Sequence, residues 1–252
     1  MATNKERLDS ALVRRGLAPS RERAQALIMA GQIYIRTPSG ARRMEKSGML
    51  VPHDAELYVA GPTPELKYAS RGGLKLEKAL DTFQLGPEGL VALDVGASTG
   101  GFTDCLLQHG AARVYAVDVG HGQLAWQLRN DPRVIVMEHC NIRHLATLPE
   151  PVQCVVIDVS FISLRLVLPA LVPLLAPRAW IVALVKPQFE AGKADADRGE
   201  GVISDPAIHQ RVLQELQAWI PLHTPLQVCG LTDSPIYGRE GNREFLLHLK
   251  GS

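Results

Sequence analysis

The sequence has few cysteines, and their spacing fits none of the common metal or redox motifs. The four are Cys105, Cys140, Cys154 and Cys229, too far apart for a Cys-x-x-Cys pair. Cys105 falls in a predicted helix and Cys154 in a predicted strand, so we expect buried free thiols. Such thiols are usual in a reducing cytoplasm, where we expect this protein to act. No Cys/His/Asp cluster offers a metal site, and we expect none.

Long uninterrupted apolar runs are also missing. The first residues, MATNKERLDS, contain no apolar signal-peptide core. The most apolar window, residues 166–185, is long enough to cross a bilayer. It contains three prolines and Arg178, which favour a core helix, a break and a buried strand over one membrane helix. We therefore expect no stable membrane association.

Neither sign of charge dominates the chain, but the balance is uneven along it. Residues 1–60 contain ten Lys/Arg and six Asp/Glu, whereas the remaining 192 contain 17 and 20. A basic N-terminal region suggests a polyanionic partner, although an ordinary solvated face would look the same. With 46% hydrophobic residues, the 252-residue chain can bury one large α/β core or two smaller ones.

Residues 1–61 are predicted to form a small αβ module. Apolar spacing predicts a helix over residues 7–17 and a second helix that Ser20 caps and Gly31 ends, without a full capping box. A short strand, residues 32–36, follows. The pattern R-L-D-x-x-L…S-R-x-x-A-x-x-L-I-x-x-G-x-I-x-I resembles the RNA-binding domain of small-subunit ribosomal protein S-four. Arginine side chains suit phosphate contacts, and the arginines expected to bind RNA are Arg7, Arg14, Arg15, Arg21, Arg23 and Arg71.

After a proline-containing linker at residues 62–69, strands and helices alternate over residues 70–252. The predicted strands are 91–95, 113–118, 133–137, 153–158, 179–185, 225–230 and 243–249. This alternation predicts a doubly wound α/β domain with a mostly parallel sheet.

A glycine turn and a strand-end acid predict a nucleoside site in this domain. Residues 93–102, LDVGASTGGF, read as a strand, a tight turn and a helix start. Asp118 ends the next strand, where a carboxylate can accept from ribose hydroxyls. The G-x-x-x-G-G spacing differs from the pyrophosphate-binding G-x-G-x-x-G, so S-adenosylmethionine is the expected ligand. A purely structural turn is the alternative.

Four charged residues are predicted to meet at the same edge of the sheet. Asp158 and Lys186 each follow a fully apolar strand, where ligands bind in such folds. Glu244 precedes the last strand and reaches this edge if that strand is antiparallel. Lys75 lies on the helix before the first strand. A buried strand usually ends in a polar residue in any case, so the position of these four residues alone does not assign them a catalytic role.

These four residues resemble the K-D-K-E tetrad of FtsJ-type ribose 2′-O-methyltransferases. Nearly the whole chain resembles the TlyA family, also named haemolysin A, through S-R-G-G-x-K-L, D-V-G-A-S-T-G-G-F-T, G-Q-L-A-W-x-L-R-N-D-P-R-V, D-V-S-F-I-S-L, L-V-K-P-Q-F-E and G-N-x-E-F. The resemblance implies a seven-stranded Rossmann-like methyltransferase sheet. The expected activity is ribose methylation of a cytidine in ribosomal RNA. Both ends of the sequence resemble the shorter subclass of this family, so we expect the large-subunit RNA to be the substrate.

The turn, the strand-end acid and the resemblance together define a set of expected cofactor contacts. They are Asp94, Gly96, Ala97, Ser98, Gly100, Gly101, Phe102, Asp118, Asn141 and Asp158. Asn141 follows a strand, as an adenine-edge contact requires, but a turn residue would stand there as well.

A ribose hydroxyl must lose its proton as it attacks a methyl group, and Lys186 is the expected general base. Burial and a neighbouring Lys75 would both favour its neutral form. Asp158 would hold the lysine head, and Glu244 would orient Lys75 or the ribose. Since methyl transfer is an in-line displacement, positioning should supply most of the catalysis.

Three other classes remain open. A non-catalytic RNA-binding protein would have lost a tetrad member, and none is lost. A membrane-active haemolysin would need an export signal or a clean span. A small-molecule dehydrogenase would need the pyrophosphate-binding spacing G-x-G-x-x-G, which this turn does not have. Nucleoside analysis of incubated rRNA would discriminate among them, whereas oligomeric state is not readable.

Overall fold

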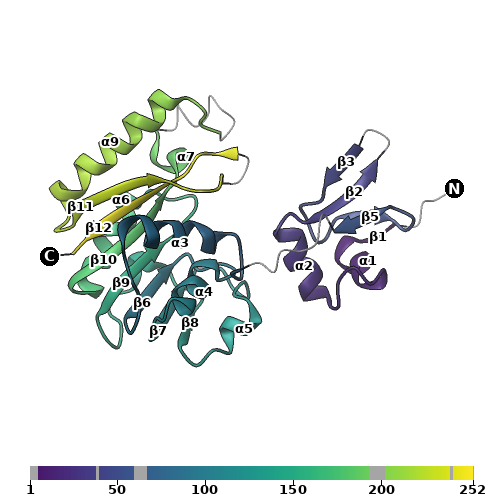
Figure 1. The fold of residues 1–252 in the computed structure, drawn as a ribbon, viewed down its shortest axis with the longest axis horizontal. Helices are drawn as coiled ribbons and strands as arrows, with labels where there is room; N and C mark the ends of the chain where they lie inside the picture. The colour runs from purple at the N-terminus through teal and green to yellow at the C-terminus, as the bar shows by residue number, and fades with distance from the viewer. Residues whose placement is uncertain (1–4, 38–39, 60–66, 193–201, 239–240, 252) are drawn as a thin grey trace. The chain divides into compact units, whose positions relative to one another are not determined.

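Two units make up the chain in the computed structural model, Met1–Lys67 and Tyr68–Ser252 (Figure 1). The structure describes residues 5–37, 40–59, 67–192, 202–238 and 241–251. Residues 62–66 of the expected linker lie outside the described residues.

The first unit packs two helices against two small antiparallel sheets. Its elements are β1 (Lys5–Arg7), α1 (Leu8–Arg14), α2 (Arg21–Met29), β2 (Ile33–Thr37), β3 (Gly40–Arg43), β4 (Leu50–Pro52) and β5 (Leu57–Val59). Strand β1 pairs with β4, and β2 lies between β3 and β5. The predicted cap is present, because the Ser20 side chain accepts a hydrogen bond from the Arg23 amide at 3.2 Å. The core contains Leu8, Leu12, Ile28 and Ile33, which are almost fully buried.

The second unit is built on a seven-stranded sheet in the order β11-β12-β10-β9-β6-β7-β8. Its strands are β6 (Val91–Val95), β7 (Arg113–Val117), β8 (Val134–Met137), β9 (Val152–Ile157), β10 (Leu175–Val185), β11 (Gln227–Asp233) and β12 (Phe245–Lys250). The five from β10 to β8 run parallel. Strand β12 pairs antiparallel with β10 and β11. The predicted mostly parallel sheet is therefore confirmed. The last strand is antiparallel, which is the condition under which Glu244 reaches the edge where the parallel strands end.

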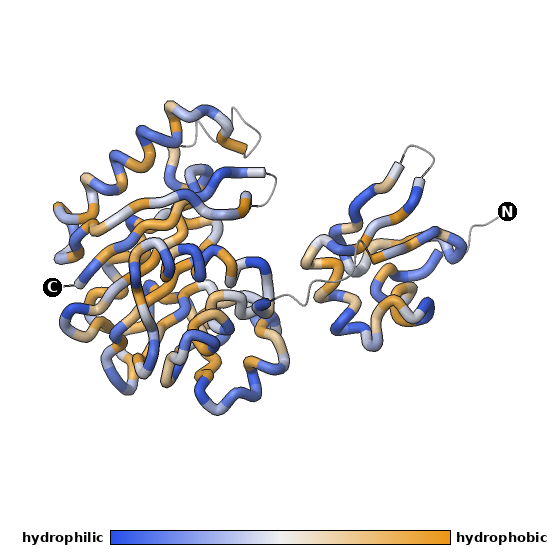
Figure 2. The backbone as a smooth tube through the Cα atoms, in the orientation of Figure 1, coloured by the Kyte–Doolittle hydropathy of each residue, from blue (hydrophilic) through white to orange (hydrophobic). Residues whose placement is uncertain are grey.

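Helices cover the sheet on both faces. They are α3 (Gly72–Phe83), α4 (Gly101–Gln108), α5 (Trp126–Arg129), η1 (Ile142–His144), α6 (Leu164–Leu171), η2 (Val172–Leu174), α7 (Pro187–Glu190) and α9 (Pro206–His223). Alternate residues of each central strand enter two apolar clusters. Leu93 and Val95 pack with α6 and α9, whereas Ala92 packs with α3 and α4. Burial on both faces explains the fully apolar strands, which Figure 2 shows in orange inside the unit.

The apolar window at residues 166–185 is confirmed as part of this core. It contains most of α6, then η2, then β10. Among the residues that the structure describes, no helix is long and apolar enough to cross a membrane.

A buried carboxylate, Asp9, ties the two helices of the first unit together. It is fully buried and accepts hydrogen bonds from Arg7 (2.9 and 3.0 Å), Arg21 (3.1 Å), Gln25 (3.2 Å) and the Ser10 amide (2.9 Å). The bonds from Arg7, then those from Gln25 and Arg21, hold the pKa of Asp9 well below its usual range. A depressed pKa means that this carboxylate stabilises the unit above its unfolded pKa of about 3.9, and that the stabilisation is lost as pH falls below that value.

We expect Asp9→Asn to destabilise the first unit by roughly 1.5–3 kcal/mol, because hydrogen bonds to a charged acceptor are lost. Hydrogen exchange of the full chain should speed up in α1 and α2 and stay unchanged in β9, the internal control. Unchanged exchange in both helices would show that Asp9 is not a structural centre.

Candidate functional site

The predicted charged residues meet at one edge of the second sheet. Asp118, Asp158 and Lys186 follow the carboxyl ends of β7, β9 and β10. Glu244 precedes β12, whose first residue, Phe245, pairs with Val185 at the end of β10. Antiparallel pairing therefore brings the start of the last strand to the edge where the parallel strands end.

Two lysine–carboxylate ion pairs form there. Lys75 of α3 donates to Glu244 at 2.5 Å, and both side chains are at most 8% exposed. The Lys186 Nζ atom lies 2.6 Å from Oδ1 of Asp158. The side chain of Lys186 is 10% exposed and that of Asp158 is 24% exposed. The sequence interpretation made Lys75 a cationic neighbour of Lys186. The structure gives each lysine its own carboxylate, in agreement with the expectation that Asp158 holds the Lys186 head and with one of the two roles expected for Glu244.

Ser160 is a site residue that the sequence analysis missed. Its hydroxyl accepts a hydrogen bond from the Lys186 ammonium at 2.9 Å. Together, Asp158 and Ser160 hold two of the three N–H groups of the lysine head. The signal was present in the D-V-S-F-I-S motif, but a serine after a strand is too common to single out.

The glycine turn is shaped by contacts within the protein. Gly96 has φ +85°, and a Cβ there would lie 2.6 Å from the Asp158 carbonyl oxygen. At Gly100, with φ +93°, a Cβ would meet the Leu124 and Leu128 side chains. The turn thus lets neighbouring segments of the protein approach each other, which is a structural role of the kind that the sequence left open beside ligand binding.

Other residues of the turn lie between the strand end and α4. The Ala97 amide donates to the Val117 carbonyl, Ser98 adopts φ +47°, and Phe102 is buried in α4. Gly101 begins α4, and a Cβ there would meet the Ser70 hydroxyl.

Asp118 bridges the turn and the loop after β7. One carboxylate oxygen accepts from the Ser98 amide at 2.8 Å and the other from the Gly120 amide at 2.7 Å. Each oxygen keeps a further lone pair for a hydroxyl. Val119, the next residue, is 68% exposed and offers an apolar surface at this point.

Asp94 is fully buried beneath the turn. One oxygen accepts from the Thr103 hydroxyl at 2.6 Å, and the other has no hydrogen-bond partner among the described residues. Burial, with added repulsion from Asp158 and Asp118, raises the pKa of Asp94 to about 7.

Asn141 caps the short helix η1. Its side chain accepts from the Arg143 amide at 3.1 Å. The structure therefore provides the turn role that the sequence left open for this residue. The amide of the preceding residue, Cys140, donates to the Asp118 carbonyl at 3.0 Å, so Asn141 lies close to the loop that follows β7.

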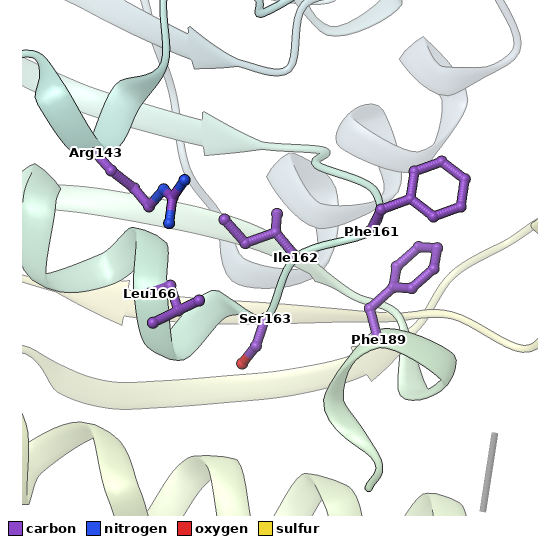
Figure 3. A pocket seen from close by; sticks show the side chains of 6 residues that line it. All are labelled: Arg143, Phe161, Ile162, Ser163, Leu166 and Phe189. Carbon is purple, nitrogen blue, oxygen red and sulfur yellow. The ribbon is translucent and has the colours of Figure 1, made fainter. Parts of the chain in front are cut away.

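An apolar pocket of about 530 Å³ is formed in part by the segments that follow Asp158 and Lys186 in the chain (Figure 3). It is lined by Arg143, Phe161, Ile162, Ser163, Leu166 and Phe189. Phe161 is 86% exposed, and its ring centroid lies 5.0 Å from that of Phe189. The sequence analysis missed both aromatic residues.

Most arginines expected to bind RNA in the first unit have partners within it. Four of the five are held by acids or carbonyls: Arg7 and Arg21 by Asp9, Arg14 by Glu6, and Arg15 by the carbonyls of His53 and Ala55. Arg23 is exposed, as is Arg71 at the start of α3 in the second unit. All of these arginines were expected to bind RNA, and the structure gives four of them a further role in holding the fold.

The residues around the turn suit a nucleoside cofactor without phosphates. Asp118 has acceptor capacity for ribose hydroxyls, Val119 offers an apolar face, and Asp94 has an unused oxygen beneath the turn. S-adenosylmethionine fits this set of acceptors and apolar surface.

Two protein-family models match the chain. The FtsJ-like methyltransferase model matches residues 68–251, and the S4 domain model matches residues 6–35.

Similar proteins cover nearly the whole chain. A Bacillus subtilis protein provisionally named as an rRNA methyltransferase is 49% identical over 256 residues, which cover 99% of this chain and 87% of the relative. The Mycobacterium tuberculosis protein named 16S/23S rRNA (cytidine-2′-O)-methyltransferase TlyA is 46% identical over 255 residues, 97% of this chain and 89% of the relative. A solved structure from Streptococcus thermophilus, provisionally titled a hemolysin, has a TM-score of 0.74 at 45% identity and covers 100% of this chain and 90% of that chain.

Replacing Asp118 should weaken binding of S-adenosylmethionine. Asp118→Ala should cost roughly 1–3 kcal/mol of binding free energy, because a ribose contact and the anchor of the turn are both lost. Isothermal titration measures this, with Asp131→Ala as control, since Asp131 also accepts from a backbone amide, that of Arg133. Equal affinities for the wild type and Asp118→Ala would remove Asp118 from the site.

The raised pKa of Asp94 predicts a pH-dependent stability. Its folded-state value of about 7 lies above the unfolded value of about 3.9, so the native state binds the extra proton between these two values. Stability is therefore lost as pH rises through this interval, by about 1.4 kcal/mol for each pH unit. Asp94→Asn removes this effect. The Tm of Asp94→Asn relative to the wild type, without cofactor, should therefore rise from pH 5 to pH 8. A constant difference would mean that Asp94 stays ionised throughout.

Proposed function

The chain belongs to the TlyA family of FtsJ-like methyltransferases, and from this premise we propose that it methylates the ribose 2′-hydroxyl of a cytidine in ribosomal RNA, using S-adenosylmethionine. The observation that carries the proposal is the pair of lysine–carboxylate contacts, Lys75–Glu244 and Lys186–Asp158, at the sheet edge beside the glycine turn.

Lys186 accepts the proton of the attacking hydroxyl. Asp158 and Ser160 fix the lysine head from two sides, so its third position is free to face the ribose. A positioned base of this kind contributes typically 10²–10⁴-fold to a rate.

Lys75 and Glu244 form the second side of the site. Both side chains are almost inaccessible to water, and their contact holds α3 against the start of β12. A charge pair buried to this extent provides fixed dipoles, which need no rearrangement during the reaction. Its role is to orient the ribose beside Lys186.

The Gly96–Gly101 turn, Asp94 and Asp118 would hold S-adenosylmethionine, which supplies an electrophilic methyl group. Asp118 accepts from the ribose hydroxyls while its amide contacts keep the turn in place. Asp158 lies between this turn and Lys186, since its carbonyl oxygen faces Gly96 and its carboxylate faces the lysine.

Ribosomal RNA or a ribosomal subunit is the partner, which implies a cytoplasmic place of action. The S4 match covers residues 6–35, where the arginine cluster lies. Exposed Phe161, which lines the pocket, suits stacking on an unpaired base. Large-subunit rRNA is the proposed substrate, and the mycobacterial relative is named for both 16S and 23S rRNA.

The proposal predicts that Lys186→Arg abolishes activity, because guanidinium cannot be deprotonated in the usable pH range. Single-turnover methylation of large-subunit rRNA, read as 2′-O-methylcytidine by mass spectrometry, should slow at least about 10²-fold. Lys78→Arg, on the exposed face of α3, is the matched control and should react at the wild-type rate.

Near-normal activity of Lys186→Arg would limit this residue to holding charge, and the base would then be Asp158 or water. If the wild type methylates small-subunit rRNA and not large-subunit rRNA, the proposed substrate is wrong. A wild type that methylates neither RNA would support the non-catalytic RNA-binding alternative.

A further inference from the structure

Glu190 is a buried carboxylate that the proposed chemistry does not use. It ends the short helix α7, four residues after Lys186, and closes the L-V-K-P-Q-F-E motif. Its side chain is directed to the segment that follows Asp158. One oxygen accepts from the Ser163 hydroxyl at 2.6 Å, and the other accepts from the Leu164 amide at 2.7 Å.

These two contacts join the segment that carries the proposed base, Lys186, to the segment that carries its two partners, Asp158 and Ser160. The first segment runs from Asp158 through Ser160 to Ser163, the N-cap of α6. The second runs from Lys186 through α7 to Glu190. At one end of this pair of segments, Lys186 contacts Asp158 and Ser160. At the other end, Glu190 contacts Ser163 and Leu164.

The first segment needs an external restraint. Phe161 has φ +63°, a left-handed conformation that a bulky side chain adopts only when its surroundings impose it. Phe161 also contacts Phe189, the neighbour of Glu190, so ring contact and hydrogen bonds act between the same two segments (Figure 3).

Burial of Glu190 has a cost that its position offsets only in part, so the pKa of this carboxyl is raised on balance. Desolvation raises the pKa of this carboxyl, whereas the Leu164 amide, the Ser163 hydroxyl and the charge of Arg165 lower it. A carboxylate at the start of α6 also satisfies amides that have no partner within the helix.

We propose that Glu190 is a positioning residue for methyl transfer, which holds the Asp158–Ser163 segment against the Lys186–Glu190 segment so that Asp158 and Ser160 face the Lys186 amine. This inference rests on the proposed function. A displacement of about 1 Å at a reacting group can cost on the order of 10²-fold in rate, so loss of Glu190 acts on the chemical step without touching substrate.

Glu190→Ala and Glu190→Gln test the proposal. In single-turnover methylation, Glu190→Ala should lower the maximal rate on the order of 10- to 100-fold. The KM for rRNA and the affinity for S-adenosylmethionine should change by about twofold or less. Glu190→Gln should restore most of the rate, because its amide oxygen still accepts from Leu164 and its NH₂ group donates to the Ser163 hydroxyl.

Asp205→Ala is the matched control for loss of a helix cap. Asp205 accepts from the Ala207 amide at 2.8 Å at the start of α9 and bonds neither segment. It should lower Tm, as loss of a helix cap does, while leaving the rate unchanged. If Glu190→Ala does not fold, Ser163→Ala removes one of the two contacts and should give a smaller loss of maximal rate with unchanged KM.

Wild-type rates in Glu190→Ala and Ser163→Ala would overturn the proposal. So would equal loss of rate in Asp205→Ala, which would show that general stability is responsible. Failure of Glu190→Gln to restore any rate would show that the charge matters and the hydrogen-bonded brace does not. A wild type without methyl transfer would instead remove the proposed function itself.

Discussion

The antiparallel pairing of β12 with β10 is the constraint on which the site depends. Because Phe245 pairs with Val185, Glu244 lies at the edge of the sheet where β10 ends and Lys186 follows. Strand β12 is six residues long, so a parallel β12 would place Glu244 about 20 Å away, at the opposite edge. Lys75 of α3 would then lack its carboxylate. One strand direction thus determines whether the two ion pairs share an edge.

The charges at this edge depend on one another because little water reaches them. Removing one partner from a buried pair typically costs about 3–5 kcal/mol, since the other charge is left uncompensated. Lys75 and Glu244 are in this position. Asp94 shows the contrasting case, a buried carboxylate with one hydroxyl donor and no cation bound to it among the described residues, and its pKa is raised accordingly. A buried carboxyl group is therefore an ionised ion-pair partner where a cation contacts it, and it retains its proton to higher pH where none does.

The sequence predicted the elements that have a strong periodic signal. All seven strands of the second sheet, the Ser20 cap and the positions of Asp158, Lys186 and Glu244 follow from apolar runs and the residues that end them. The short strands β1, β3, β4 and β5 have only three or four residues, too few for a period to show. The choice of side-chain partners was also out of reach. The contacts of Ser160 with Lys186 and of Ser163 with Glu190 join residues 26 and 27 positions apart, and only the folded chain decides such pairs.

The first unit adds a reason why paired arginines can still serve recognition. A guanidinium has five N–H donors, and Arg21, held by Asp9 through one nitrogen, remains 56% exposed. Held in this way, the side chain has already lost much of its rotamer freedom, so contact with a phosphate costs less entropy than it would for a free arginine. The acids reduce the net positive charge but fix the direction of each donor. For the RNA contacts proposed above, the arrangement of these arginines would matter more than their number, which a simple charge count over residues 1–60 does not describe.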